Sequence, residues 1–167
     1  MTNLEIARKT LERVRAAGVT DFCVCGGSRN APLIAALADG RWPMAETQDT
    51  SANGERPTAN VFSFVDERSA AFFALGRIKR DDRPVAVITT SGTAAAELLP
   101  ATIEAYYSGA PLVLITADRP ARFRGTAAPQ SIEQIGLFGV YAQTDFDRWN
   151  RRAPLHINIE FDEPLIE

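Results

Sequence analysis

Four short polar stretches of the chain each follow an apolar run, and they hold most of the side chains that could do chemistry. They occupy positions 26–29 (Gly-Gly-Ser-Arg), 66–68 (Asp-Glu-Arg), 91–93 (Ser-Gly-Thr) and 118–120 (Asp-Arg-Pro). The first stretch could cradle a phosphate, could form only a tight turn, or could present Ser28 and Arg29 to a substrate. The third resembles the start of a helix that binds an anion through its backbone N–H groups.

Each stretch also has a purely structural explanation. Asp66 fits the N-cap of a helix, and Glu67 in the first turn would favour the helix dipole. Residues 91–93 could form an ordinary helix cap, and Asp118 could form a local ion pair with Arg119. Taken one at a time, the stretches therefore leave both interpretations open.

The apolar runs predict the elements that must position these side chains. Five strands are predicted, at 21–25, 61–65, 85–90, 112–116 and 155–161. Helices are predicted between Thr2 and Gly18, at 32–38, at 66–80, at 93–107 and around 131–138. Pro100 is expected to kink or split the fourth helix, because proline has no backbone N–H.

The alternation of strand and helix predicts an α/β fold, a three-layer, doubly wound and mostly parallel sheet. We expect residues 1–167 to form a single domain, with 41–60 as a flexible surface loop. Parallel sheets bind ligands at the carboxyl ends of their strands, so the four polar stretches should share one edge. That many Ser, Thr, Arg and carboxylate groups exceed what solvation requires, which favours a functional site there.

Composition and missing motifs narrow the function. The net charge is −3 at pH 7 and no Lys/Arg cluster occurs, which argues against nucleic-acid binding. The apolar runs are far shorter than the roughly 18 residues of a membrane span, and the N-terminus lacks the apolar core of a signal peptide. We therefore expect a cytoplasmic protein with no membrane contact. A P-loop, the spacing G-x-G-x-x-G and a zinc spacing are all missing, and the single histidine, His156, argues against a Ser-His-Asp triad.

The two cysteines, Cys23 and Cys25, are expected to be reduced, buried thiols. We also expect their side chains to point to opposite faces of a strand, so that they neither pair nor share a metal ion. No metal ligand is predicted in the chain.

Several stretches together resemble one enzyme family. They are GGSRNAPL, FVDERSAAFFALG, TTSGTAAAELLPATIEAYYSGAPLVLITADRP, GTAAPQSIEQIGLFG and the closing HINIEFDEPL. In this order and spacing they resemble the N-terminal pyrimidine-binding domain of the 2-succinyl-5-enolpyruvyl-6-hydroxy-3-cyclohexene-1-carboxylate synthases. These are thiamine-diphosphate-dependent transferases of menaquinone biosynthesis. The resemblance implies decarboxylation of 2-oxoglutarate on the cofactor and addition of the succinyl unit to isochorismate.

The resemblance also implies how the cofactor is held. Glu67 matches the catalytic glutamate that bonds the aminopyrimidine ring nitrogen, and Ser91, Gly92 and Thr93 match the stretch beside the cofactor. The diphosphate would be bound through Mg²⁺ or Mn²⁺ by a domain that this chain lacks. The resemblance thus implies one domain of a larger enzyme, inactive when isolated.

Four residues match the family's substrate-binding positions. Ser28 and Arg29 match residues that contact substrate, Arg119 matches a second arginine for carboxylates, and Gln130 matches a glutamine that bonds the reacting substrate. Both substrates are dicarboxylic acids, which the planar fork of an arginine suits. Family sites form against the diphosphate-binding domain of a partner subunit, so a homodimer or a dimer of dimers is implied.

The chain departs from the family pattern at several places, and the loop at 41–60 looks like an insertion. Gly26 stands where proline is usual, Pro129 stands where asparagine is common, and the connection between Tyr141 and Pro154 is too short for the usual helix. Two alternatives stay open. The chain could belong to another thiamine-diphosphate carboligase or decarboxylase, or it could be a non-catalytic interaction domain.

Overall fold

The computed structural model describes residues 1–39 and 59–166 of the chain. The predicted surface loop at 41–60 lies outside the described residues up to position 58, and Asn60 already belongs to a strand.

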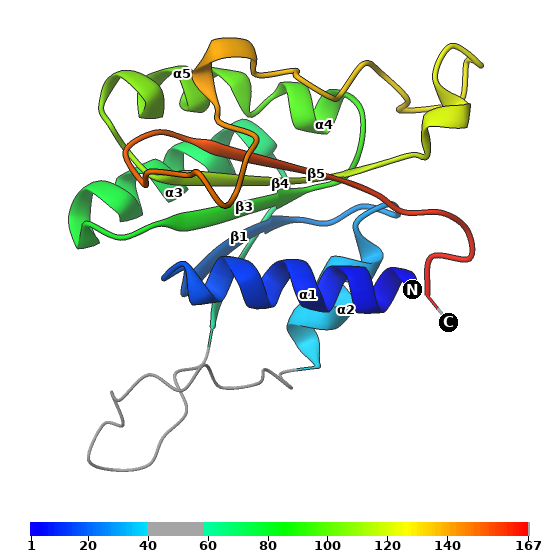
Figure 1. Ribbon diagram of the computed structural model, residues 1–167, viewed down its shortest axis with the longest axis horizontal. Coiled ribbons are helices and arrows are strands. Elements are labelled where there is room, and N and C mark those ends of the chain that lie inside the picture. Colours follow the sequence, from blue (N-terminus) through cyan, green and yellow to red (C-terminus); the bar gives the residue numbers. More distant parts are fainter. Residues whose placement is uncertain (40–58, 167) are drawn as a thin grey trace.

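A five-stranded sheet forms the middle layer, and all its strands are parallel (Figure 1). The strands are β1 (Asp21–Cys25), β2 (Asn60–Phe64), β3 (Val85–Thr89), β4 (Leu112–Asp118) and β5 (Leu155–Glu160). Their order across the sheet is β2-β1-β3-β4-β5, so the chain reverses its direction of winding between β1 and β3. In such sheets ligands bind at the carboxyl ends beside this reversal.

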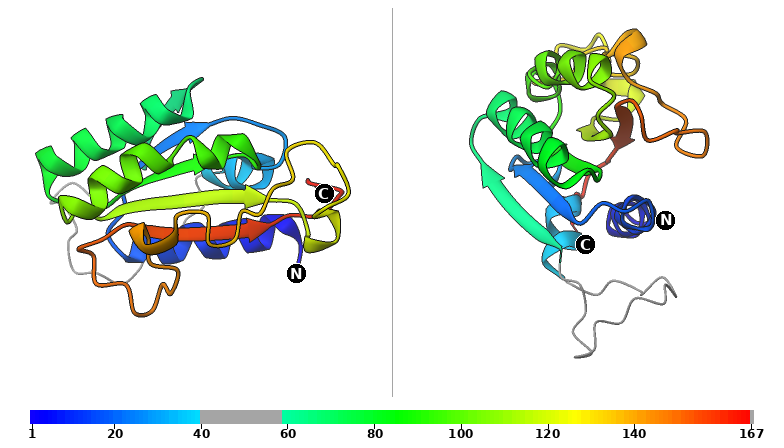
Figure 2. Two further views of the ribbon diagram at one scale, coloured as in Figure 1. Left: turned by 90° about the horizontal axis from the view of Figure 1, so that it is seen from above. Right: turned by 90° about the vertical axis from the view of Figure 1, so that its left-hand side faces the viewer.

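Helices cover both faces of the sheet, which confirms the predicted α/β architecture (Figure 2). Helices α1 (Asn3–Ala16) and α2 (Ala31–Ala38) cover one face. Helices α3 (Glu67–Asp81), α4 (Thr93–Ala96) and α5 (Leu99–Tyr107) cover the other. Each face has its own buried apolar cluster, and β1, β3 and β4 are buried along their whole length.

Local sequence signals explain where the helices begin. Thr2 and Glu5 form a capping box at α1, and the Asp66 side chain accepts a hydrogen bond from the Ser69 N–H at α3. The predicted helix at 93–107 is split into α4 and α5, and Pro100 lies in the first turn of α5, where no N–H partner is needed.

The predicted helix around 131–138 is wrong. The chain there forms turns, and the only regular pieces on either side are two short 3₁₀ helices, at Ala121–Phe123 and Gly139–Tyr141, among the described residues. Gly136 has a φ of +74°, which a helix does not allow, and the Gln134 N–H bonds the Ile132 carbonyl instead of a helical partner. The Gln134 side chain is drawn into the protein, which fixes this irregular path.

The cysteines are free and buried, but the expectation that they face opposite sides of the sheet is wrong. Residues two apart in a strand share a face, and Cys23 and Cys25 both pack in the cluster beneath α3 and α5. Burial raises the pKa of both thiols to about 12.

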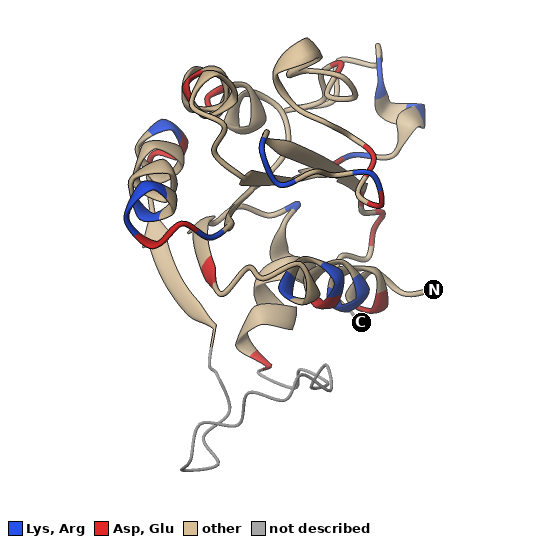
Figure 3. Cartoon of the chain, turned by 60° about the vertical axis from the view of Figure 1, so that its left-hand side comes forward, with Lys and Arg blue, Asp and Glu red and all other residues tan. Residues whose placement is uncertain are grey.

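Charges on the outer helices are of mixed sign (Figure 3). Lys and Arg alternate with Asp and Glu along α1 and at the C-terminal end of α3, and Lys79 of α3 pairs with Glu104 of α5 at 3.3 Å. These charged side chains make the outer faces of the helices polar.

Candidate functional site

The turn after β1 is closed by a side chain of its own. Asn30 is fully buried, its Oδ1 accepts from the Gly27 N–H at 2.9 Å, and its Nδ2 donates to the Cys25 carbonyl at 2.8 Å. Because Asn30 already uses the Gly27 N–H, the phosphate-cradle interpretation loses its main donor. Ser28 lies exposed at the tip of this turn. Asn30 was not among the predicted site residues, although asparagine typically bonds nearby backbone groups in turns.

Gly27 touches the end of β3, at the winding reversal of the sheet. A Cβ built on Gly27 would lie 2.6 Å from Thr90 Cβ, whereas the nearest atom to a Cβ on Gly26 is Ile34 Cδ1 at 3.9 Å. Only the second glycine is therefore required by packing. Gly26, which departs from the family's proline, has room for a side chain.

We expect Gly27→Ala to destabilise the chain by about 1–3 kcal/mol, because Thr90 would have to move away from the turn. Gly26→Ala, the matched control, should change the free energy of unfolding by less than about 0.5 kcal/mol. Urea unfolding of both variants measures the difference. Equal stability of the two variants would contradict the close contact.

Arg29 is held under the C-terminal segment of the chain. Its Nη1 donates to the Phe161 carbonyl at 2.9 Å and its Nη2 to Glu163 Oε1 at 3.1 Å. The Arg29 side chain is only 5% exposed, whereas that of Glu163 is 69% exposed. The guanidinium that was predicted to bind a substrate carboxylate thus already bonds a carboxylate of its own chain, on the solvent side.

Glu67 is the first residue of α3 and lies beside the end of β1. Its side chain is half-buried. Burial is the main cause of the raised pKa of Cys25, and the negative charge of Glu67 raises it further. Within residues 1–39 and 59–166, no hydrogen bond or ion pair engages the Glu67 carboxylate. The carboxylate is therefore left available to a group from outside the described structure.

The stretch 91–93 meets the loop that carries Gln130. Gly92 has a φ of +77°, and the Gln130 Oε1 accepts from both the Thr93 N–H at 2.8 Å and the Thr93 hydroxyl at 3.1 Å. Gln130 therefore caps the short helix α4 in place of an anion. The contact brings together the predicted cofactor stretch and the predicted substrate glutamine.

Arg119 lies against the same loop. Its Nε donates to the Pro129 carbonyl at 2.9 Å, and its guanidinium lies 5.6 Å from the centre of the Phe123 ring. Asp118 pairs with Arg124 at 3.0 Å. Arg119 donates to the Asp118 carboxylate through its backbone N–H and not through its guanidinium, so the ion pair of adjacent side chains suggested by the sequence does not form.

A buried hydrogen-bond network joins β4 and β5 behind these residues. The Thr116 hydroxyl donates to Asn158 Oδ1 at 2.9 Å, so it must accept from His156 Nε2, 2.7 Å away. Asn158 Nδ2 in turn donates to Asp118 Oδ2 at 2.9 Å. Burial lowers the pKa of His156 from 6.5 to about 4, so the ring is neutral near pH 7.

The buried His156 predicts a specific acid sensitivity. Its pKa is lower when folded than when unfolded, so the unfolded chain binds the extra proton between pH 6.5 and about 4. We expect the free energy of unfolding to fall by an amount on the order of 3 kcal/mol over this window and to be flat above it. Urea unfolding of wild type and His156→Gln at pH 7.5, 6 and 5 tests this. A wild-type slope as flat as the variant's would contradict it.

The predicted site residues thus lie along one edge of the sheet. The turn after β1 touches the end of β3 through Gly27, and Gln130 and Arg119 share a loop that covers the ends of β3 and β4. Arg29 reaches the same edge through Phe161, whose N–H bonds the Asp118 carbonyl at 3.0 Å. The arrangement offers a half-buried carboxylate and two arginines at the strand ends.

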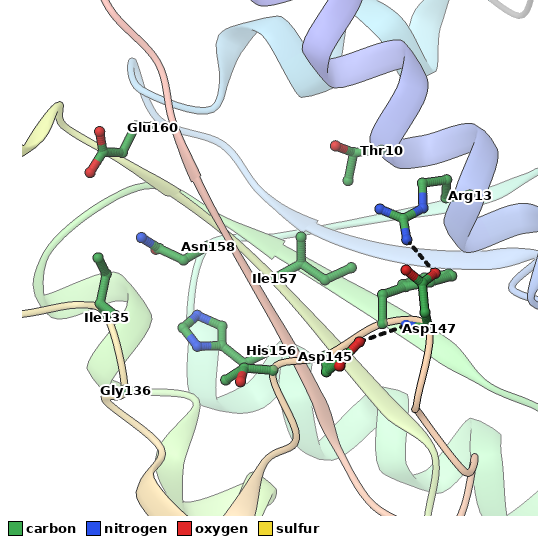
Figure 4. Close-up of a pocket in the computed structure, with 12 residues that line it drawn as sticks. Thr10, Arg13, Ile135, Gly136, Asp145, Asp147, His156, Ile157, Asn158 and Glu160 are labelled. Carbon is green, nitrogen blue, oxygen red and sulfur yellow. Dashed lines mark hydrogen bonds and ion pairs between the residues drawn. The ribbon is translucent and has the colours of Figure 1, made fainter.

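A cavity of about 690 Å³ lies elsewhere, along the outer edge of β5 (Figure 4). Arg13 of α1 and its ion-pair partner Asp147 form one side, and Ile135 and His156 lie on the other. None of the predicted site residues lines this cavity.

No helix of the described segments is long and apolar enough to cross a membrane. Among the described residues, no three His, Cys, Asp or Glu side chains gather where they could hold a metal ion.

Comparison with known proteins places the chain among thiamine enzymes. Residues 4–137 match the family described as the thiamine pyrophosphate enzyme, N-terminal TPP binding domain. The chain is similar to the 2-succinyl-5-enolpyruvyl-6-hydroxy-3-cyclohexene-1-carboxylate synthase of Bdellovibrio bacteriovorus, with 44% identity over 100% of the chain and 31% of the relative. It is similar to the enzymes of the same name from Akkermansia muciniphila (48% identity; 88% of the chain, 27% of the relative) and Geobacillus kaustophilus (38%; 96% and 29%). The chain thus spans less than a third of the length of these relatives.

Proposed function

The chain belongs to the N-terminal TPP binding domain family of thiamine pyrophosphate enzymes, and from this membership we propose that it supplies the pyrimidine-binding part of a 2-succinyl-5-enolpyruvyl-6-hydroxy-3-cyclohexene-1-carboxylate synthase. The complete enzyme would decarboxylate 2-oxoglutarate and add the succinyl unit to isochorismate. The observation that carries the proposal is the half-buried, unpartnered carboxylate of Glu67 at the strand ends of this domain. Thiamine pyrophosphate and thiamine diphosphate are two names of one cofactor.

The residues at this edge fit the cofactor's pyrimidine ring. Glu67 can offer its carboxyl group to a ring nitrogen and hold a proton there, because nothing in the described structure occupies it. Ser91 and Gly92 are buried and Thr93 is exposed, so this stretch could form the wall beside the ring. When bound, the cofactor supplies the electron sink for decarboxylation and carbon–carbon bond formation.

The two arginines support dicarboxylic substrates. Arg29 and Arg119 both lie at the edge that carries Glu67, and each can bind a carboxylate through charge-assisted hydrogen bonds. On Arg29 a substrate carboxylate would take the place of the exposed Glu163. Ser28 at the tip of the first turn and Gln130 at the start of α4 would add neutral hydrogen-bond partners.

The rest of the site would come from elsewhere. We place Mg²⁺ or Mn²⁺ and the diphosphate in a diphosphate-binding domain contributed by a partner subunit. A site shared between two domains is open on each of them, which agrees with the exposed positions of Ser28 and Gln130. The cytoplasmic location stays a prediction from the sequence.

An exposed apolar surface supports association into a homodimer or a dimer of dimers. The groove between α3 and α5 is lined mainly by apolar groups, and Tyr106, Tyr107 and Tyr141 form a cluster of ring contacts beside it. Tyr107 and Val140 are each more than 70% exposed. Apolar side chains gathered in this way mark protein contact surfaces.

The proposed activity is tested on the complete gene product that contains this chain. With thiamine diphosphate and Mg²⁺ we expect release of CO₂ from 2-oxoglutarate, coupled to consumption of isochorismate. Decarboxylation of another 2-oxo acid with no use of isochorismate would favour a different carboligase. Absence of any decarboxylation would favour the non-catalytic interaction domain.

A further inference from the structure

Gln134 is a buried glutamine whose amide is fully used. Its side chain is 0% exposed, in a segment that forms turns and no helix. The Oε1 accepts from the Gly92 N–H at 2.9 Å, and the Nε2 donates to the Ala117 carbonyl at 2.9 Å and to Asn158 Oδ1 at 2.7 Å. One side chain thus connects the loop after β3 with β4 and β5.

The orientation of this amide is fixed by its partners. The Gly92 N–H can only donate and the Ala117 carbonyl can only accept, so the oxygen of Gln134 must face Gly92. A flipped amide, or any side chain of a different length, would leave buried polar groups without partners. Such groups are strongly unfavourable, which makes the position of Gly92 depend on Gln134.

Gly92 is the point at which two glutamines of the same loop meet. Gln134 bonds its N–H, while Gln130 packs against its α-carbon so closely that an added Cβ would lie 2.7 Å from Gln130 Cα. Gln130 also bonds the next residue, Thr93. The placement of Gly92 therefore decides where the exposed amide of Gln130 and the hydroxyl of Thr93 lie at the sheet edge.

We propose that Gln134 is a positioning residue for the site, which pins Gly92 to the strand ends and through it sets the positions of Gln130 and Thr93. Its influence on catalysis rests on the proposed function, but its influence on Gly92 does not. Gln134 itself reaches no exposed surface, so it acts only through the residues it holds.

Amide hydrogen exchange of this chain, followed by NMR, directly tests the hydrogen bond between the Gly92 N–H and Gln134. In wild type the Gly92 N–H should exchange slowly, although it lies in a loop. In Gln134→Met it should exchange at least about tenfold faster, the ratio that corresponds to the loss of one buried hydrogen bond. Thr116→Val is the matched control, because it removes a hydroxyl from the same network without touching Gly92. The Gly92 exchange rate should stay within about twofold of wild type in that control.

The exchange result decides the proposal even if Gln134→Met fails to fold. Fast exchange of Gly92 in wild type, at the rate of exposed loop amides, would overturn it. Unchanged Gly92 exchange in a folded Gln134→Met would also overturn it.

Kinetics of the complete enzyme separate positioning from simple stabilisation. We expect Gln134→Met to lower kcat by an amount on the order of 100-fold, because misplaced groups lose their alignment. The KM of Gln134→Met should change much less than its kcat. Thr116→Val should keep the wild-type kcat although its melting temperature is similar to that of Gln134→Met. Equal kcat in the two variants would overturn the positioning role. An inactive wild-type enzyme would instead refute the proposed function and leave the exchange result standing.

Discussion

Replacing Glu67 by glutamine is expected to lower kcat of the complete enzyme by about 100-fold to 10,000-fold, the range for loss of a group that holds or transfers a proton. The change keeps the size and shape of the side chain, so the fold and the start of α3 should persist. An amide, however, neither takes up nor releases a proton near neutral pH. CO₂ release from 2-oxoglutarate at saturating thiamine diphosphate measures the effect.

Glu97→Gln provides the matched control for this experiment. The substitution is chemically the same, but Glu97 is the exposed residue at the C-terminal end of α4. It is not one of the residues assigned to the site. We expect its kcat to stay within about twofold of wild type. If Glu67→Gln behaves like Glu97→Gln, the assigned role of Glu67 is wrong.

Most of the fold could be predicted because its signals are local. Apolar runs predicted the five strands, and the capping box at Thr2 and the proline at position 100 predicted helix boundaries that the structure confirms. The parallel arrangement then determined that the polar stretches share one edge. Each of these steps needed only neighbouring residues and a general rule of sheet topology.

The buried polar residues could not be predicted in the same way. Asn30 and Gln134 have ordinary polar neighbours in the sequence, and nothing local distinguishes them from solvated side chains. Their partners lie across the fold, as with Gln134 and Gly92, which are 42 positions apart. The predicted helix at 131–138 failed for the same reason, since three long-range hydrogen bonds of Gln134 outweigh a weak local preference.

Arg29 illustrates what the sequence leaves open within the site. Its residue type and position predicted a carboxylate partner, and the structure provides one from Glu163, 134 positions later. The sequence could not reveal that the C-terminal segment returns to this edge. The assignment of Arg29 to a substrate therefore depends on exchange of an exposed internal carboxylate for an external one.

Gly92→Ala is expected to lower stability more than alanine at any other described glycine. A φ of +77° disfavours every residue with a Cβ, and the new Cβ would lie 2.1 Å from Gln130 Oε1 and 2.7 Å from Gln130 Cα. The second contact is with backbone, so rotation of a side chain cannot relieve it. Backbone strain of about 1–3 kcal/mol and displacement of the loop should together lower the free energy of unfolding by about 3 kcal/mol or more.

Gly125→Ala separates the two causes of this loss. Gly125 has a similar φ of +73°, but nothing lies within 4 Å of the position of its Cβ. Its replacement should therefore show the backbone strain alone, about 1 kcal/mol, and leave Gln130 undisturbed. Urea unfolding of the two variants, with NMR shifts of the Thr93 amide as a local probe, measures both effects. Equal losses of stability with an unmoved Thr93 signal would mean that Gly92 is required only for its backbone angle, and that Gln130 is free to leave it.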